Sequence, residues 1–172
     1  WLTMRKVAGE AKMSLGIRQY HFKDKTSLMG GLAEHNFGEC SQMLDGYQHT
    51  PPKGSKEEQL HQFILSLLEH VDHVDQISDM CRVFREMWAL SARDPEIHRQ
   101  LVSYYQVTVE KLTALLVPIS CSEQSASRLA SLLLPYLEGY SITCEALPID
   151  KIETARMLTK LCGEFLGDNG SG

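Results

Sequence analysis

A chain of 172 residues with 43% hydrophobic residues can bury one substantial core, or a small domain and a larger one, and its longest apolar run, at residues 132–134, is too short to span a membrane. The net charge of −5 is uneven: residues 1–32 hold six Lys or Arg against two carboxylates, a net charge of +4, which leaves −9 for the remaining 140 residues. An acidic chain with one basic end is expected to contact a polyanion at that end, although a solvated surface is the alternative.

The cysteines are odd in number and have no C-x-x-C spacing, so the sequence predicts neither a disulfide framework nor a zinc site. This usage fits a reducing cytoplasm, and no signal peptide is visible. Most of the cysteines fall on apolar helical stripes, where we interpret them as small core residues, with redox sensing as the alternative. They are Cys40, Cys81, Cys121, Cys144 and Cys162.

The first 47 residues predict two short helices and one long helix. Thr3 can cap a helix with one apolar face over residues 4–11, and Ser14 can cap a second helix. Gly16, which has no side chain, would let the first turn of that second helix lie close to another backbone, such as a phosphate strand. This is the pattern of a DNA-recognition helix. Asp24 can cap a third, longer helix that continues to Tyr47.

The order and spacing of these motifs resemble the tetracycline-repressor (TetR) family of bacterial transcription regulators. The resemblance rests on residues 3–8, 14–16 and 20–25 (TMRKVA, SLG and YHFKDK) and covers the first quarter of the chain. In that family one more helix precedes this motif, so the native protein is expected to be longer and to begin before Trp1. Ile17, Arg18 and Gln19 depart from the family pattern, so the set of residues that reads bases is expected to be particular to this protein.

The resemblance implies contacts with double-stranded operator DNA. Arg18 or Gln19 is expected to make polar contacts with bases, and Lys25 is expected to contact phosphate. The candidate DNA-binding residues are Thr3, Arg5, Ser14, Leu15, Gly16, Ile17, Arg18, Gln19, Tyr20, His21 and Lys25.

The segment 46–54 is the one plausible linker, because its Pro-Pro pair and two glycines cannot continue a helix. We therefore predict an all-α protein with a helix-turn-helix domain and connecting helix at residues 1–46 and a helical domain for effector binding and dimerisation at residues 55–167. Ser55 with Glu58 predicts a capping box, and Asp94 followed by Pro95 predicts another helix start.

The last two predicted helices carry more apolar surface than one chain can cover. Between residues 122 and 147 apolar residues occupy more than one face, and a helix that starts at Asp150, boxed by Glu153, adds a further stripe. The surplus predicts a homodimer, and the resemblance implies a four-helix bundle between subunits; a larger monomeric core is the alternative. The predicted interface residues are Leu129, Leu133, Leu137, Ile152, Ala155, Leu158, Cys162 and Phe165.

A group of Met and aromatic residues is richer than ordinary core. Such side chains repack around varied shapes, and Trp and Tyr bring polar tips into an apolar cavity, so the group is typical of a small-molecule pocket. Ordinary packing is the alternative, and the resemblance favours an effector site among these helices, with an apolar or aromatic ligand. The candidate residues are Met80, Phe84, Met87, Trp88, Tyr104 and Tyr105, with Tyr136 and Tyr140 on the dimer-facing side.

Nothing in the sequence indicates an enzyme or a cofactor. The two histidines in residues 70–75 lack a third metal ligand at fixed spacing, so a solvated helix end is the preferred interpretation. Arg85 and Glu86 have no nucleophile beside them, and no glycine-rich phosphate loop exists. We therefore predict a cytoplasmic, ligand-responsive homodimeric repressor at a palindromic operator. The alternatives are a helical interaction protein that keeps a degenerate motif, and an activator on the same fold.

Overall fold

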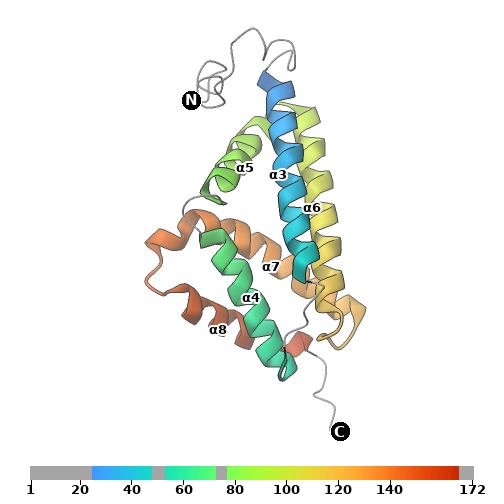
Figure 1. Ribbon diagram of the computed structural model, residues 1–172, viewed down its shortest axis with the longest axis vertical. Coiled ribbons are helices and arrows are strands. Elements are labelled where there is room, and N and C mark those ends of the chain that lie inside the picture. Colours follow the sequence, from blue (N-terminus) through green and yellow to red (C-terminus); the bar gives the residue numbers. More distant parts are fainter. Residues whose placement is uncertain (1–24, 48–52, 73–76, 167–172) are drawn as a thin grey trace.

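The computed structural model describes residues 25–47, 53–72 and 77–166, and all of its regular elements are helices, as predicted. Figure 1 shows their arrangement. The helices are α3 (Lys25–Tyr47), α4 (Lys56–Asp72), α5 (Ile77–Ser91), α6 (Pro95–Leu116), α7 (Glu123–Thr143) and α8 (Lys151–Leu161), with short 3-10 helices η1 (Cys144–Ala146) and η2 (Gly163–Phe165).

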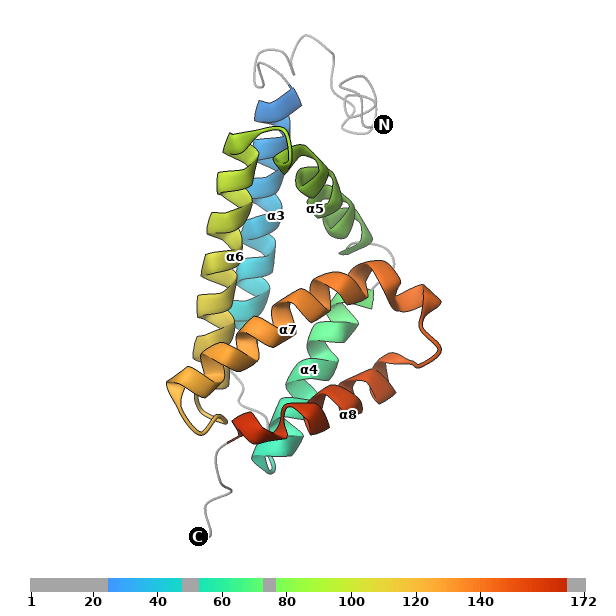
Figure 2. The same cartoon turned by 180° about the vertical axis from the view of Figure 1, so that it is seen from behind.

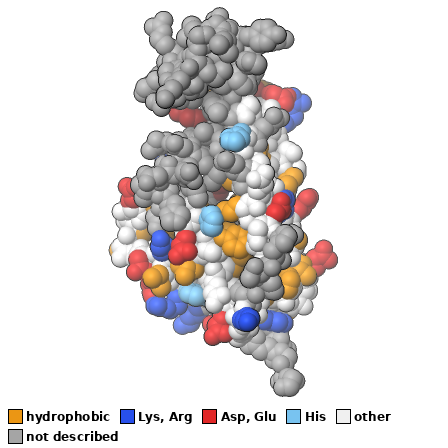
Figure 3. Space-filling view, viewed as in Figure 1, with side chains coloured by type: hydrophobic (Ala, Val, Ile, Leu, Met, Phe, Trp, Pro, Cys, Tyr) orange, Lys and Arg blue, Asp and Glu red, His pale blue; other side chains and the backbone are white. Residues whose placement is uncertain are grey.

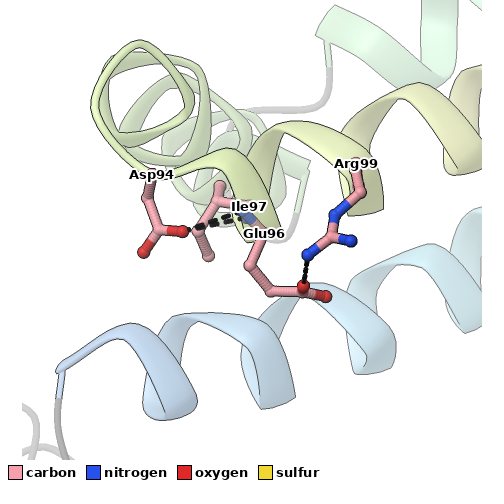
Figure 4. Close-up of polar contacts among 4 residues, drawn as sticks. All are labelled: Asp94, Glu96, Ile97 and Arg99. Atoms are coloured by element: carbon pink, nitrogen blue, oxygen red, sulfur yellow. Dashed lines mark hydrogen bonds and ion pairs between the residues drawn. The ribbon is translucent and has the colours of Figure 1, made fainter.

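Two of the predicted helix starts are confirmed in atomic detail. At α4 the backbone N–H of Ser55 donates to the Glu58 carboxylate over 2.8 Å, and the N–H of Glu58 donates back to Ser55 Oγ over 3.2 Å, which is a complete capping box. At α6 the Asp94 carboxylate accepts the backbone N–H groups of Glu96 and Ile97, and Pro95 follows the cap directly (Figure 4). At the start of α4 and at the start of α6, the capping side chains thereby accept hydrogen bonds from backbone N–H groups that have no partner within the helix.

The box predicted at α8 forms only in part. Asp150 accepts the backbone N–H of Glu153 over 2.8 Å, but the Glu153 carboxylate pairs with Arg156 one turn along the helix. The 3-10 turn η1 likewise replaces the last turn of the helix predicted to reach residue 147. The sequence therefore predicts where the helices start more accurately than it predicts which long side chains pair.

The helices form two groups along the long axis of the molecule. In both views α3 and α6 lie side by side and run in the same direction, with α5 against their upper part (Figures 1 and 2). The other three helices, α4, α7 and α8, lie across the lower end, where α4 contacts both α7 and α8. Within the described ranges, no helix combines the length and the apolar content needed to cross a membrane.

Each group has its own core. We call the larger one the aliphatic core; it is built mainly from leucine and isoleucine side chains of α4 and α7, and it also includes the lower end of α6. Its residues Leu60, Ile64, Leu68 and Leu129 have no exposed surface. The smaller one, which we call the aromatic cluster, joins α3, α5 and α6. Its members are Cys40, Phe84, Met87, Ile97 and Leu101, with Phe37, Leu90, Tyr104 and Tyr105 packed against them.

Most of the residues predicted for a dimer interface are already buried within the chain. The apolar stripe of α4 covers one face of α7 and one face of α8, and this face holds most of the predicted set. Of that set only Ile152 is largely exposed. Leu129, Leu133, Leu137, Ala155 and Cys162 are buried, and Leu158 and Phe165 are partly buried against the same core.

The outward faces of α7 and α8 carry a different set of apolar side chains. Leu161 is 72% exposed and Ile142 is 61% exposed. Apart from Ile152, the exposed apolar side chains of α7 and α8 are therefore at other positions than the predicted interface residues. The exposed apolar residues there are Leu132, Ile142, Ile152, Met157 and Leu161.

Candidate functional site: an aromatic cavity between two cores

A cavity of about 730 Å³ lies where the aliphatic core and the aromatic cluster meet. Helices α3, α4, α5, α6 and α7 all contribute to its wall. Apolar side chains gather in the middle of the face that carries α3 and α4, whereas charged side chains surround the lower end (Figure 3). A cavity of this size and composition can enclose a drug-sized molecule, for which typical pockets measure about 300–1,000 Å³.

Four of the residues predicted for a ligand pocket line this cavity: Phe84 and Trp88 from α5, and Tyr104 and Tyr105 from α6. Met87 is not in the wall and is completely buried in the aromatic cluster. Tyr136 and Tyr140 are not in the wall; their rings stack on each other, with centroids 6.3 Å apart. The side chain of Met80 is outside the described part of the chain.

The aromatic rings form a continuous wall. Tyr104 stacks on Phe37 at a centroid distance of 4.0 Å, and it also contacts Phe84 at 5.1 Å and Tyr105 at 5.2 Å. The ring of Trp88 lies 5.9 Å from that of Tyr105. Pairs at these spacings stabilise the arrangement of rings beyond their area burial. Burial also raises the pKa of Tyr104 well above its usual value, so its hydroxyl stays neutral.

Hydrogen bonds run from the aromatic wall to a carboxylate on α7. The indole N–H of Trp88 donates to the Tyr105 hydroxyl over 3.0 Å, and that hydroxyl hydrogen-bonds to Glu138. Burial raises the pKa of Glu138, and the hydrogen bond from Tyr105 lowers it by a smaller amount. Glu138 was not among the predicted site residues, because a single Glu within an apolar helix also fits an exposed position.

Arg85 contributes a cationic side chain to the described cavity wall, and this side chain is hydrogen-bonded to a backbone carbonyl of α7. The guanidinium of Arg85 donates to the backbone carbonyl of Ser141 over 2.7 Å, and the Arg85 side chain is exposed. Among the described residues, no Lys or Arg forms an ion pair with Glu138. The carboxylate therefore lies in an apolar wall with a tyrosine hydroxyl as its polar partner.

His70 also lines the cavity, which differs from the solvated helix end that the sequence suggested. Its Nδ1 lies 2.8 Å from the carbonyl oxygen of Ser66 and 3.2 Å from the hydroxyl of Tyr47. Because a carbonyl oxygen can only accept, Nδ1 carries the proton in this arrangement. Over the described ranges, no three His, Cys, Asp or Glu side chains are grouped so that they could hold a metal ion.

Comparison with known proteins decides the family. The chain is 39% identical over 153 residues to a protein from Xanthobacter autotrophicus described as an HTH-type transcriptional regulator in the dhlA 5′ region, which covers 89% of this chain and 74% of the relative. A crystal structure from Rhodococcus sp., described as belonging to the TetR family of transcriptional regulators, has the same fold at 19% identity. Its TM-score is 0.64, and the match covers 94% of this chain and 86% of that one. The chain belongs to the HTH-type transcriptional regulators, and it has the fold of a TetR-family structure.

No family model matches the sequence of this regulator. The candidate DNA-binding residues from Thr3 to His21 lie outside the described residues, as does the side chain of Lys25, the first residue of α3. The described part of the regulator therefore begins where the motif ends. The division into domains at residues 46–55 stays a prediction.

One polar contact fixes α3 to α6 beside the cavity. Lys111 Nζ lies 2.6 Å from a carboxylate oxygen of Asp45 and also donates to Ser41. Both acceptors belong to α3, whereas the lysine belongs to α6. In this regulator, the helix that follows the motif is thereby joined to a second helix of the cavity wall.

Proposed function

We propose that the protein is a repressor that binds a palindromic operator as a homodimer and releases it when a small molecule enters the cavity. The observation that carries the proposal is the position of α3. This helix begins directly after the helix-turn-helix motif and contributes Cys40, Met43 and Leu44 to the cavity wall. A ligand that shifts α3 relative to α6 would therefore move the DNA-reading residues.

DNA binding is assigned to the basic N-terminal segment. Arg18 and Gln19 would read base edges, whereas Lys25 would contact phosphate. Loss of a base contact in Arg18→Ala is expected to cost about 1–3 kcal/mol and to relax specificity at one operator position, while Lys25→Ala should weaken binding to all sequences alike. Equal losses on operator and on random DNA for Arg18→Ala would remove it from the base-reading set.

Dimerisation is assigned to the exposed apolar residues of α7 and α8, in place of the buried set that the sequence suggested. An isologous interface needs one self-complementary patch on each subunit, and Leu132, Ile142, Met157 and Leu161 supply apolar side chains for it. Exposed large apolar residues that form a contiguous patch are typical of interaction surfaces, and the proposal requires that these residues form one.

Release would follow from the geometry of a dimer on DNA. Two recognition helices must be spaced by about 34–36 Å to enter successive major grooves, so a change in the tilt of α3 would misplace both. The ligand need only prefer the non-binding spacing: a preference of about 1–3 kcal/mol would lower operator affinity about 5- to 150-fold.

The test is binding of the full-length protein to DNA from upstream of its own gene. The proposal expects a specific complex on this DNA and none on a scrambled duplex, followed by its release by an inducing small molecule. Trp88→Ala and Tyr105→Ala should keep operator binding and lose the response. A specific complex that no cavity variant affects would mean that the effector, if any, binds elsewhere; the absence of a specific complex would favour the interaction protein.

Light scattering tests the dimer. The variant Leu161→Glu places a charge in the assigned patch and should yield monomers with a loss of operator binding. Its matched control is Val102→Glu on α6, which also replaces an exposed apolar residue but lies outside α7 and α8. If both variants behave alike, the patch on α7 and α8 is not the interface.

A further inference from the structure

We infer that the cavity binds an organic cation, whose positive charge pairs with Glu138 while its apolar body lies against the rings of Trp88 and Tyr105. The inference rests on the proposed effector site and adds the charge and chemical class of the ligand. The sequence alone suggested only an apolar or aromatic effector. The additional information comes from what surrounds the carboxylate.

Glu138 is a partly buried carboxylate in a wall made largely of apolar and aromatic side chains. An ionised carboxylate can accept about four hydrogen bonds, and the structure gives it one, from the Tyr105 hydroxyl. A desolvated carboxylate with unused acceptor sites is unfavourable unless a cation or further donors compensate for the lost water. Among the described lining residues, no Lys or Arg forms an ion pair with Glu138, so a ligand ammonium group would fill that role.

The rings beside the carboxylate suit a cation as well. Trp and Tyr attract cations over their ring faces through the quadrupole of the π-system, and Trp does so most strongly. Trp88 and Tyr105 are held next to each other by the hydrogen bond from the indole N–H, which also fixes the hydroxyl that reaches Glu138. One hydrogen-bonded group thus brings two aromatic rings and one carboxylate to the wall of the same cavity.

The positively charged groups of the wall do not favour an anion. Arg85 is exposed and its guanidinium is bonded to the Ser141 carbonyl, while His70 uses Nδ1 for the Ser66 carbonyl. Neither forms an ion pair with Glu138. A ligand carboxylate entering the cavity would meet the like charge of Glu138 without a free cationic side chain of fixed position to offset it.

Calorimetry with three probes of similar size tests the inference on the full-length protein. The probes are (4-phenylbutyl)trimethylammonium, the neutral 5-phenylpentan-1-ol and the anionic 4-phenylbutane-1-sulfonate. The cation should bind at least tenfold more tightly than the alcohol, and the sulfonate should bind most weakly. Equal or reversed affinities, or no binding of the cation at millimolar concentration, would overturn the assignment. This ranking needs no variant.

A variant then locates the charge. Glu138→Gln keeps the shape and should lower the affinity for the cation at least tenfold while leaving that for the alcohol unchanged. The matched control is Glu145→Gln, which removes an exposed carboxylate of η1 that is not part of the cavity wall. Unchanged affinity for the cation in Glu138→Gln would show that the charge binds elsewhere.

Operator binding measured with the same probes separates this inference from the proposed function. If the cation binds through Glu138 but leaves operator binding intact, the assignment of the cation stands and the effector role fails. If the alcohol and the cation release operator equally, the effector site stands and the cation preference fails.

Discussion

The aliphatic core and the aromatic cluster differ in how completely they are filled. In the aliphatic core, branched side chains from α4, α6 and α7 pack together with little or no exposed surface. The aromatic cluster borders open space: its Tyr105 lines the cavity, and Trp88, whose ring lies beside that of Tyr105, is 52% exposed. Dense packing fixes one arrangement of helices, whereas rings beside open space can move without leaving a void. The protein thus combines a rigid base with an adaptable wall.

Truncation should separate the two regions most clearly. Leu133→Ala in the aliphatic core is expected to lower the free energy of unfolding by about 2–5 kcal/mol, because it leaves a cavity among packed neighbours. Trp88→Ala removes a larger side chain from the cavity wall, yet should cost less, because about half of that side chain is already in contact with solvent. Urea unfolding at one fixed protein concentration measures both, and a larger loss for Trp88→Ala would mean that the aromatic cluster is the true core.

The partly buried carboxylate of Glu138 should make the free energy of unfolding depend on pH. Burial raises the folded-state pKa of Glu138 above its unfolded value, so the folded state binds the proton more tightly. Its contribution to stability is therefore present below the unfolded pKa of about 4.5 and is lost as the pH rises through the folded pKa. Glu138→Gln should then be more stable than the wild type at neutral pH, with the advantage vanishing in acid. A constant difference across pH would place the carboxylate in solvent.

A smaller, stabilising effect is expected where α7 borders the cavity. Gly139 lies inside this helix, and a Cβ added there would meet no heavy atom within 4 Å. Gly139→Ala should therefore raise the free energy of unfolding by about 0.5–1 kcal/mol, because it restricts the unfolded chain without a clash. Thermal unfolding would reveal it. Destabilisation would instead indicate that the wall is closely packed at this point.

The smallest effect is expected for the contact that ties α3 to α6. Lys111→Met should cost less than about 1 kcal/mol, because the Asp45 side chain is half exposed and the pair is screened by solvent. Arg99→Met, which breaks the exposed pair with Glu96 on α6 (Figure 4), is the matched control and should cost less still. A loss of several kcal/mol for Lys111→Met would make this contact part of the rigid base.

The features that the sequence could predict are local ones. A capping box such as Ser55 with Glu58 connects residues three apart, so the pattern contains both partners. The stripe on α4 predicts one buried face because its other faces are polar. Aromatic residues at helical spacing on α5 and α6 were enough to find Phe84, Trp88, Tyr104 and Tyr105 in the cavity wall.

The features that the sequence could not predict depend on contacts between distant helices. Helix α7 has apolar residues on two faces, and only the positions of α6 and α4 decide that Leu129 and Leu133 are buried while Leu132 is exposed. Glu138 gained its role through Tyr105, 33 residues earlier on another helix, and no spacing rule connects them. The contact between Tyr47 and His70 also joins two different helices, so it could not be predicted from spacing along the chain either.

The double use of α3 has a consequence for how this regulator can change in evolution. Cys40 belongs to the aromatic cluster and Leu44 to the aliphatic core, and both also line the cavity. A substitution at either position therefore alters stability and ligand contact together, whereas one at the half-exposed Trp88 alters the ligand contact at a smaller cost in stability. Selection for a new inducer should accordingly yield substitutions on α5, α6 and α7, while the α3 wall remains nearly invariant.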